Sequence, residues 1–172
     1  MSSERSLILL LALAAFAPAM SAQAATPPRC YTAELTVTPG PAQGAAGSIG
    51  QTVRFRNISG HTCTLDGYPG LQMRSASGSA LATHIHRGSS VTVSARPVRL
   101  VTLGPGRQAA FDIGYAAATG FGNERCPASA RVQVTPPNDF KPLTISWRLQ
   151  PYGGSIPHLE CGLINVSPVY TG

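Results

Sequence analysis

The chain has 172 residues, of which 43% are hydrophobic and 12% charged, and its net charge at pH 7 is +6. The basic residues are scattered singly, with no Lys/Arg run and no helix or aromatic motif suited to reading or stacking bases, so we exclude nucleic acid as a partner. A charge of +6 draws a protein only weakly to anionic surfaces such as lipid headgroups or wall polymers. Arginine-, alanine- and glycine-rich usage is typical of a GC-rich bacterial genome.

Residues 1–24 have the features of a secretory signal peptide. Arg5 supplies the positive start, residues 7–17 are an unbroken apolar run, Pro18 ends it, and Ala22-Gln23-Ala24 is a small-x-small cleavage site. A run of 11 residues is too short for a spanning helix, which needs about 20. We therefore predict cleavage after residue 24 and a secreted or periplasmic protein that is soluble and does not span a membrane.

The mature chain has the size of one domain. Removing 24 of the 172 residues leaves 148, and a chain of that length buries roughly 70% of its unfolded surface. Residues 25–29 form a short Pro-rich lead, and residues 30–172 are expected to form a single β-sandwich domain. Cys30 does not end a lipoprotein signal, because the residues before it are Pro27-Pro28-Arg29 rather than small apolar ones.

Short runs of alternating apolar and polar residues, separated by Gly, Pro, Asn and Ser, recur along the mature chain. This period of two predicts half-buried strands, and frequent prolines oppose helices. The runs lie at residues 33–37, 52–56, 91–94, 98–103, 109–115, 132–135, 143–149 and 163–169. They predict an all-β fold, an immunoglobulin-like antiparallel β-sandwich of about 7–9 strands; a small Greek-key barrel is the alternative. Trp147 should face the core and Asp112 the solvent.

Four cysteines remain after cleavage, an even number that predicts disulfides in an exported chain. None are close enough for a C-x-x-C redox or zinc pair. Three pairings are possible, and the spacing alone does not choose among them. We favour Cys30–Cys63 with Cys126–Cys161, each of which closes a loop of roughly 30 to 35 residues and stabilises the fold by about 3 to 4 kcal/mol in the chain-entropy model.

His84-Ile85-His86 is the most specific candidate for a metal site. On a strand, residues i and i+2 share a face, so both imidazoles could reach one ion. A third ligand would have to come from His61, Asp66, Met73 or His158. The simpler interpretation, which we favour, places both histidines on the wet face of a strand or loop without metal.

Catalytic signatures are weak. No G-x-S-x-G elbow is present, and no two acidic residues are near neighbours in the sequence. Ser155 and His158 lie three residues apart in a Pro-interrupted loop, and the nearest orienting acid is Glu160, so a hydrolase is only a remote alternative. We assign no catalytic residue, no metal ligand and no cofactor.

Residues 63–71 differ from the alternating runs. A cysteine, two glycines, a proline and Tyr68 in nine residues indicate a fixed turn. Tyr68 is either a structural tyrosine packed near a disulfide, as in the tyrosine corners of sandwiches, or the contact residue of a ligand-facing loop. We favour the structural role and keep Tyr68 as the candidate binding residue.

The segment Cys63-Thr64-Leu65-Asp66-Gly67-Tyr68-Pro69-Gly70 resembles the C-T-L-x-G-Y-P-G stretch of exported bacterial proteins that carry the domain of unknown function 4232. Weaker matching pieces lie on both sides of this segment, in the order found in the family, and span roughly residues 30 to 168. They are Cys30, 44–48, 55–59, 101–106, 126–128, Cys161-Gly162 and 166–168. The resemblance implies an exported β-sandwich domain with paired cysteines, and it implies no activity and no catalytic residue. Many members of the family look like lipoproteins, whereas this chain has a plain signal peptide.

Together these features favour a non-enzymatic extracytoplasmic module at the cell envelope. Its loops would bind a wall polymer, a glycan or an envelope protein, because residues that bind ligands are disproportionately found on loops held by a rigid scaffold. A periplasmic metal-binding protein using His84 and His86 is the first alternative, and a hydrolase using Ser155 and His158 is the second.

Overall fold

The computed structural model describes residues 25–45, 47–117, 125–153 and 160–172. The predicted signal peptide, residues 1–24, lies outside the described residues, as do Ser155 and His158. The described residues form no α-helix, and none of their helical segments is long and apolar enough to cross a membrane. The predicted all-β class is confirmed.

The described chain contains a short 3₁₀ turn followed by eleven strands. They are η1 (Thr32–Glu34), β1 (Leu35–Ala45), β2 (Ser48–Asn57), β3 (Cys63–Leu65), β4 (Gly70–Arg74), β5 (His84–Arg87), β6 (Val101–Leu103), β7 (Gln108–Ala116), β8 (Arg131–Thr135), β9 (Leu143–Ser146), β10 (Leu163–Val166) and β11 (Tyr170–Thr171).

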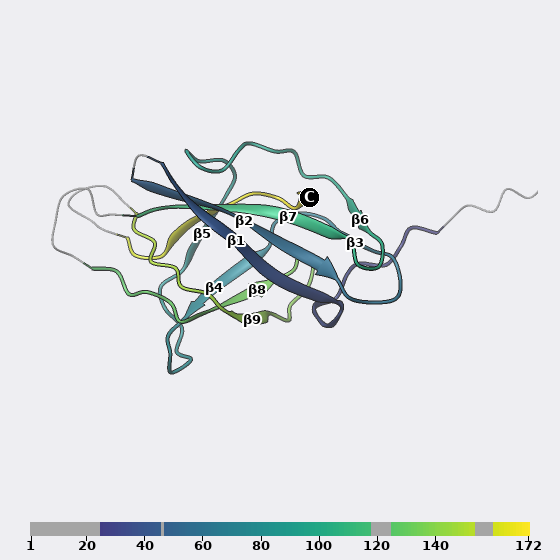
Figure 1. The fold of residues 1–172 in the computed structure, drawn as a ribbon, viewed down its shortest axis with the longest axis horizontal. Helices are drawn as coiled ribbons and strands as arrows, with labels where there is room; N and C mark the ends of the chain where they lie inside the picture. Colours follow the sequence, from purple (N-terminus) through teal and green to yellow (C-terminus); the bar gives the residue numbers. More distant parts are fainter. Residues whose placement is uncertain (1–24, 46, 118–124, 154–159) are drawn as a thin grey trace, which may run out of the picture.

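The strands form a sandwich-like arrangement of two layers (Figure 1). The larger sheet has the order β1-β2-β7-β10-β5, with β11 paired to β7, and the smaller has the order β4-β8-β9. Strands β3 and β6 pair with each other at one end of the molecule (Figure 1). Among the described strands, all pairs are antiparallel, as expected, except β5 with β10, which is parallel at one edge of the larger sheet.

The core lies between the two layers and follows from the alternation along their strands. On β2 and β7, Phe55 and Phe111 are fully buried with ring centroids 5.2 Å apart. Val132 and Val134 face them from β8 with no exposed surface. Trp147 is 7% exposed, as predicted for a core residue, and its Nε1 donates a hydrogen bond to Oε1 of Gln51 at 3.1 Å. That bond satisfies the indole N–H, which is the one polar group of the buried ring.

Two of the predicted strands do not form as expected. Residues 91–94 are not a strand: Ser90 and Val93 close a tight turn through reciprocal backbone hydrogen bonds, and Val91 is 82% exposed. Of residues 98–103, only the last three pair with a neighbouring strand. The alternation misleads here because this connection lies over a sheet and buries single side chains such as Val93 without joining a ladder.

Other differences concern strand ends and short strands. Strand β1 starts at Leu35 and continues through Pro39-Gly40-Pro41, where the alternation predicted a stop, because an edge strand tolerates proline at a bulge; the register shifts between Pro39 and Ala42. Strands β3 and β4 have three and five residues and were missed as strands, because such short segments carry too few alternations to show a period; the four residues of β5 had been assigned to a strand or a loop.

Two disulfides join the described chain, Cys30 to Cys63 and Cys126 to Cys161. These are the two pairs favoured from the sequence. Their sequence separations are 33 and 35 residues, so chain entropy alone would make the two bonds nearly equal in stabilising effect. Cys30 and Cys63 are fully buried in the core, whereas Cys161 is only half-buried.

Candidate functional site: the groove at the Tyr68 corner

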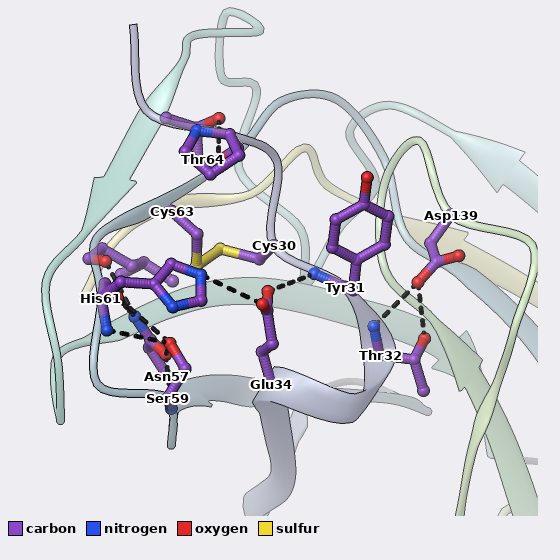
Figure 2. Close-up of polar contacts among 12 residues, drawn as sticks. Cys30, Tyr31, Thr32, Glu34, Asn57, Ser59, His61, Cys63, Thr64 and Asp139 are labelled. Carbon is purple, nitrogen blue, oxygen red and sulfur yellow. Dashed lines mark hydrogen bonds and ion pairs between the residues drawn. A yellow bond between two sulfur atoms is a disulfide. The ribbon is translucent and has the colours of Figure 1, made fainter.

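The corner formed by residues 63–70 is held from its amino-terminal side by the segment that carries Cys30. Besides the disulfide, the Cys30 N–H donates to the Thr64 carbonyl and the Thr64 N–H donates to the Pro28 carbonyl, both at 2.8 Å. Figure 2 shows the bond between Cys30 and Cys63 in the middle of this contact. The start of the corner therefore has one covalent tie and two backbone ties to the same segment.

Polar side chains brace the neighbourhood of the same disulfide (Figure 2). Glu34 accepts a hydrogen bond from the Tyr31 N–H at 2.8 Å and pairs with Nε2 of His61 at 3.0 Å. The fully buried Asn57 donates from Nδ2 to the His61 carbonyl at 2.8 Å and to the Leu103 carbonyl at 3.0 Å. His61 is thus part of this bracing and not of a histidine cluster.

The loop of residues 136–141 closes the other side of the corner. Asp139 accepts hydrogen bonds from the N–H and hydroxyl of Thr32 (Figure 2). It also accepts one from the Phe140 N–H. Burial alone would raise the pKa of Asp139, but these bonds, with one from the Lys141 N–H, hold the pKa at about 2. A carboxylate that accepts several N–H bonds stays ionised and fixes its loop.

Asn138 joins this loop to the corner through hydrogen bonds. Its φ of 60° is in the left-handed region, which asparagine tolerates better than most residues. Its carbonyl accepts a hydrogen bond from the Arg29 guanidinium, and its Nδ2 donates to the Asp66 carbonyl at 3.1 Å. Two segments that are 72 residues apart in sequence therefore meet through one side chain.

These contacts leave a groove of about 370 Å³ beside the corner. It is lined by Asp66, Gly67, Tyr68, Arg87, Val98, Pro137 and Asn138. The Arg87 guanidinium lies over the Tyr68 ring, 5.7 Å from its centroid, close enough for a cation–π contact. Gly67 has a φ of 105°, and its carbonyl accepts a hydrogen bond from the Val169 N–H at 2.9 Å. The backbone of this lining residue is therefore held as well.

The groove has the chemistry of a binding site. Arg87 offers only donors, Asp66 only acceptors, and Asn138 both, beside the face of a phenol ring. The volume is within the range of small-molecule sites, which are roughly 300 to 1,000 Å³. None of the described lining residues is a serine, cysteine or histidine, and only one is a carboxylate, so these residues show no nucleophile–base pair.

The structure places His84 and His86 on β5, at the edge of the larger sheet. Both are exposed, and Nδ1 of His86 lies 3.1 Å from Oδ1 of Asn165. The described residues contain no group of three His, Cys, Asp or Glu side chains that could hold a metal ion. Of the suggested third ligands, Met73 is 1% exposed in the core and His61 pairs with Glu34.

Asp66 and Tyr68 are the two suggested site residues that the structure brings together in one hollow. Arg87 and Asn138 were missed. Arg87 follows the histidines directly in sequence, but only the pairing of β5 with β10 brings it to the corner. Asn138 follows Pro136-Pro137, a turn signal that marks a loop without indicating which segment it meets. Ser155 and His158 lie outside the described residues.

A family model described as "Domain of unknown function (DUF4232)" matches residues 30–170. The chain belongs to this family. The match confirms the resemblance inferred from residues 63–70, which form the corner beside the groove. No curated protein and no solved structure matches the chain, so membership of DUF4232 brings no activity with it, and the groove has to be interpreted from its own residues.

Proposed function

We propose that this DUF4232 protein is a non-enzymatic binding module of the extracytoplasmic cell envelope, and that the groove at the Tyr68 corner is its ligand site. The observation that carries the proposal is the convergence of Asp66, Tyr68, Arg87 and Asn138 on one hollow. Binding sites gain affinity when their side chains are held in place before the ligand arrives. The Cys30–Cys63 bond and the bonds around Asp139 provide that restraint here.

The groove chemistry favours a glycan or a sugar-containing wall polymer over a hydrophobic ligand. A polyhydroxylated ligand needs acceptors for its hydroxyl hydrogens and donors for its oxygens, and the Asp66 carboxylate and Arg87 guanidinium offer one of each. The Tyr68 ring supplies an apolar surface for the C–H face of a sugar. An envelope protein that inserts a polar loop is the competing ligand.

The extracytoplasmic location is supported by two features. Residues 1–24 read as a signal peptide, and all four cysteines are paired. Disulfides persist in oxidising compartments and are rare in the cytosol. Periplasmic fractionation of cells that express the full chain, with a mass measurement of the mature amino terminus, checks both the compartment and the cleavage after residue 24.

The proposal is tested by retention of the mature protein on isolated wall, membrane and protein fractions of the cell envelope. We expect retention on the wall fraction, with loss of it in Tyr68→Ala and in Arg87→Gln. Tyr31→Ala is the matched control for Tyr68, because Tyr31 is 46% exposed and stacks with Arg29 at 4.7 Å but does not line the groove. Arg131→Gln, on an exposed position of β8, is the control for Arg87.

Two results would contradict the proposal. One is the absence of retention on all three fractions, and the other is equal retention of the groove variants and their controls. Digestion of the wall fraction with glycan-degrading enzymes separates the ligand classes: retention that survives digestion but is lost after protease treatment would identify a protein ligand instead.

A further inference from the structure

The outer face of the larger sheet carries arginines that are scattered in the sequence. On β2, Val53 and Phe55 are buried, so Arg54 and Arg56 point the opposite way and are exposed. Cross-strand register places Thr38 of β1 beside Arg54 on the same face. Same-side residues of a strand are about 7 Å apart, so the side chains of Arg54 and Arg56 start from neighbouring positions on one face of the sheet.

Three further arginines reach this face from the connections around it. Arg96 lies over the ring of Tyr170 at 3.8 Å, and Tyr170 sits opposite Ala110, the β7 neighbour of Arg54. Arg99 lines the same hollow as Arg96. Arg107 follows Gly106, whose Cβ position lies 3.9 Å from Nη2 of Arg56. We call the set Arg54, Arg56, Arg96, Arg99 and Arg107 the basic face.

The carboxylate found on this face is already neutralised. Asp112 was expected to face solvent, but it accepts hydrogen bonds from the hydroxyls of Thr52 and Tyr170, both at 2.7 Å, and pairs with Arg96 at 3.5 Å. Its side chain is only 13% exposed. Within the part of the chain that the structure describes, the other four arginines of the basic face form no ion pair with a carboxylate. The basic face therefore has an excess of positive charge.

The surface of the basic face is stepped. Three hollows of about 340 to 390 Å³ lie along it, lined in turn by Arg54, by Arg96 with Arg99, and by Arg107. Residues 88–100 run along the outer side of the sheet (Figure 1), with Thr92 packed on Gly50 and Gly114. They form a ridge, because Val91 and Thr92 line one side of the hollow at Arg54 and residues of β1 and β2 line the other side. A ledge beside a ridge suits a chain molecule better than the flat surface of a membrane.

We propose that the basic face binds a linear phosphate-bearing polymer of the extracytoplasmic space. Guanidinium groups bind phosphate oxygens in a planar, two-pronged geometry, and several of them along one ledge can bind successive phosphates of the same chain. This proposal goes beyond the glycan site at the Tyr68 corner and involves different side chains, so either can fail without the other.

Titration of the mature protein with long-chain inorganic polyphosphate tests the proposal. The informative variant is Arg54→Gln/Arg56→Gln, because neither side chain forms a hydrogen bond or ion pair with a described residue and the fold should persist. We expect affinity to fall at least about tenfold, given the strength of charge-assisted hydrogen bonds. The slope of log affinity against log salt should also fall by about one to two.

The matched control is Arg131→Gln/Arg148→Gln, which removes the same charge from exposed positions on the side of the smaller sheet. We expect less than about a twofold change in affinity there, since distant surface charges are largely screened at physiological salt. Tyr68→Ala should bind polyphosphate like the unmodified protein. Orthophosphate and polyglutamate serve as probes for single phosphates and for carboxylate polymers.

Four outcomes would overturn the proposal. They are no binding of polyphosphate, equal losses in the two double variants, equal affinity for polyglutamate, and binding of vesicles rich in anionic lipid without binding of polyphosphate. The second and third would indicate attraction by net charge alone, and the fourth would indicate a membrane surface as the partner.

Discussion

The Tyr68 corner and the His84–His86 edge are the two places where the sequence suggested binding, and the structure treats them differently. The corner is tied to segments around residues 28, 87 and 138 by a disulfide, backbone bonds and side chains. The edge has two exposed imidazoles, and among the described residues their one side-chain contact is from His86 to Asn165. A spacing rule thus placed two side chains on one strand correctly, but a site needs several partners from other segments, and among the described residues the corner has more of them than the edge.

The largest effect on this comparison is expected from the removal of a disulfide. Cys30→Ala/Cys63→Ala should lower the free energy of unfolding by about 3 to 5 kcal/mol, because it opens a 33-residue loop and leaves a void in the core. Cys126→Ala/Cys161→Ala opens a loop of similar length with one sulfur only half-buried, so its loss should be smaller. Urea unfolding of both double variants measures the comparison. Equal losses would show that burial of the Cys30–Cys63 bond adds nothing.

A second change acts on the bracing beside that disulfide. Asn57→Ala removes the donor for two carbonyls, those of His61 and Leu103, and we expect a loss of about 2 to 3 kcal/mol, since buried polar groups left unpaired are costly. Denaturant unfolding checks the value, and Asn165→Ala on the edge side should cost less, because Asn165 is only half-buried. A loss below that of Asn165→Ala would contradict the account.

The loop that closes the corner predicts a pH dependence. The pKa of Asp139 is about 2 in the folded protein, below its usual 3.8. The unfolded chain therefore binds the proton more readily, and the stabilisation is complete above about pH 4 and disappears as pH falls through about 2. Asp139→Asn should be less stable than the unmodified protein at neutral pH and should lose less stability between pH 4 and 2. Thermal unfolding across this range tests it, and parallel curves would refute it.

The smallest effect is expected at the edge. His84→Ala/His86→Ala removes two exposed side chains, and surface changes of this kind stay within about 0.5 kcal/mol. Zinc titration by calorimetry should give the same heat for the double variant and the unmodified protein. Binding heat seen only with the unmodified protein would show that His84 and His86 on β5 bind zinc, and it would contradict the conclusion that the edge is not a site.

A structural feature could be predicted from the sequence when a local residue pattern determined it, and could not when a long-range contact did. Alternation located most of the long strands, including residues 109–115 of β7, and placed Trp147 in the core. It failed at residues 91–94, where alternating residues pack on a sheet from outside it. Asp112 was misplaced for a related reason, because Tyr170 and Arg96 cover the outer face there.

The site was predictable only in part. Tyr68 was chosen from the density of turn residues around it, a local signal. Arg87 and Asn138 join it through the parallel pairing of β5 and through a loop 72 residues from Asp66, neither of which leaves a trace in the spacing. The basic face shows the reverse case: the period of two at Arg54 and Arg56 was visible in the sequence, but its meaning depended on which arginines the connections bring beside it.

The most direct test of the central claim is a map of backbone amide chemical shifts on addition of soluble fragments of wall glycan to the mature protein. The account predicts that the largest shifts fall on Gly67, Tyr68, Arg87 and Asn138, and that they vanish in Tyr68→Ala. Saturable shifts confined to His84 and His86, or to the strands of the basic face, with none at the corner, would contradict it.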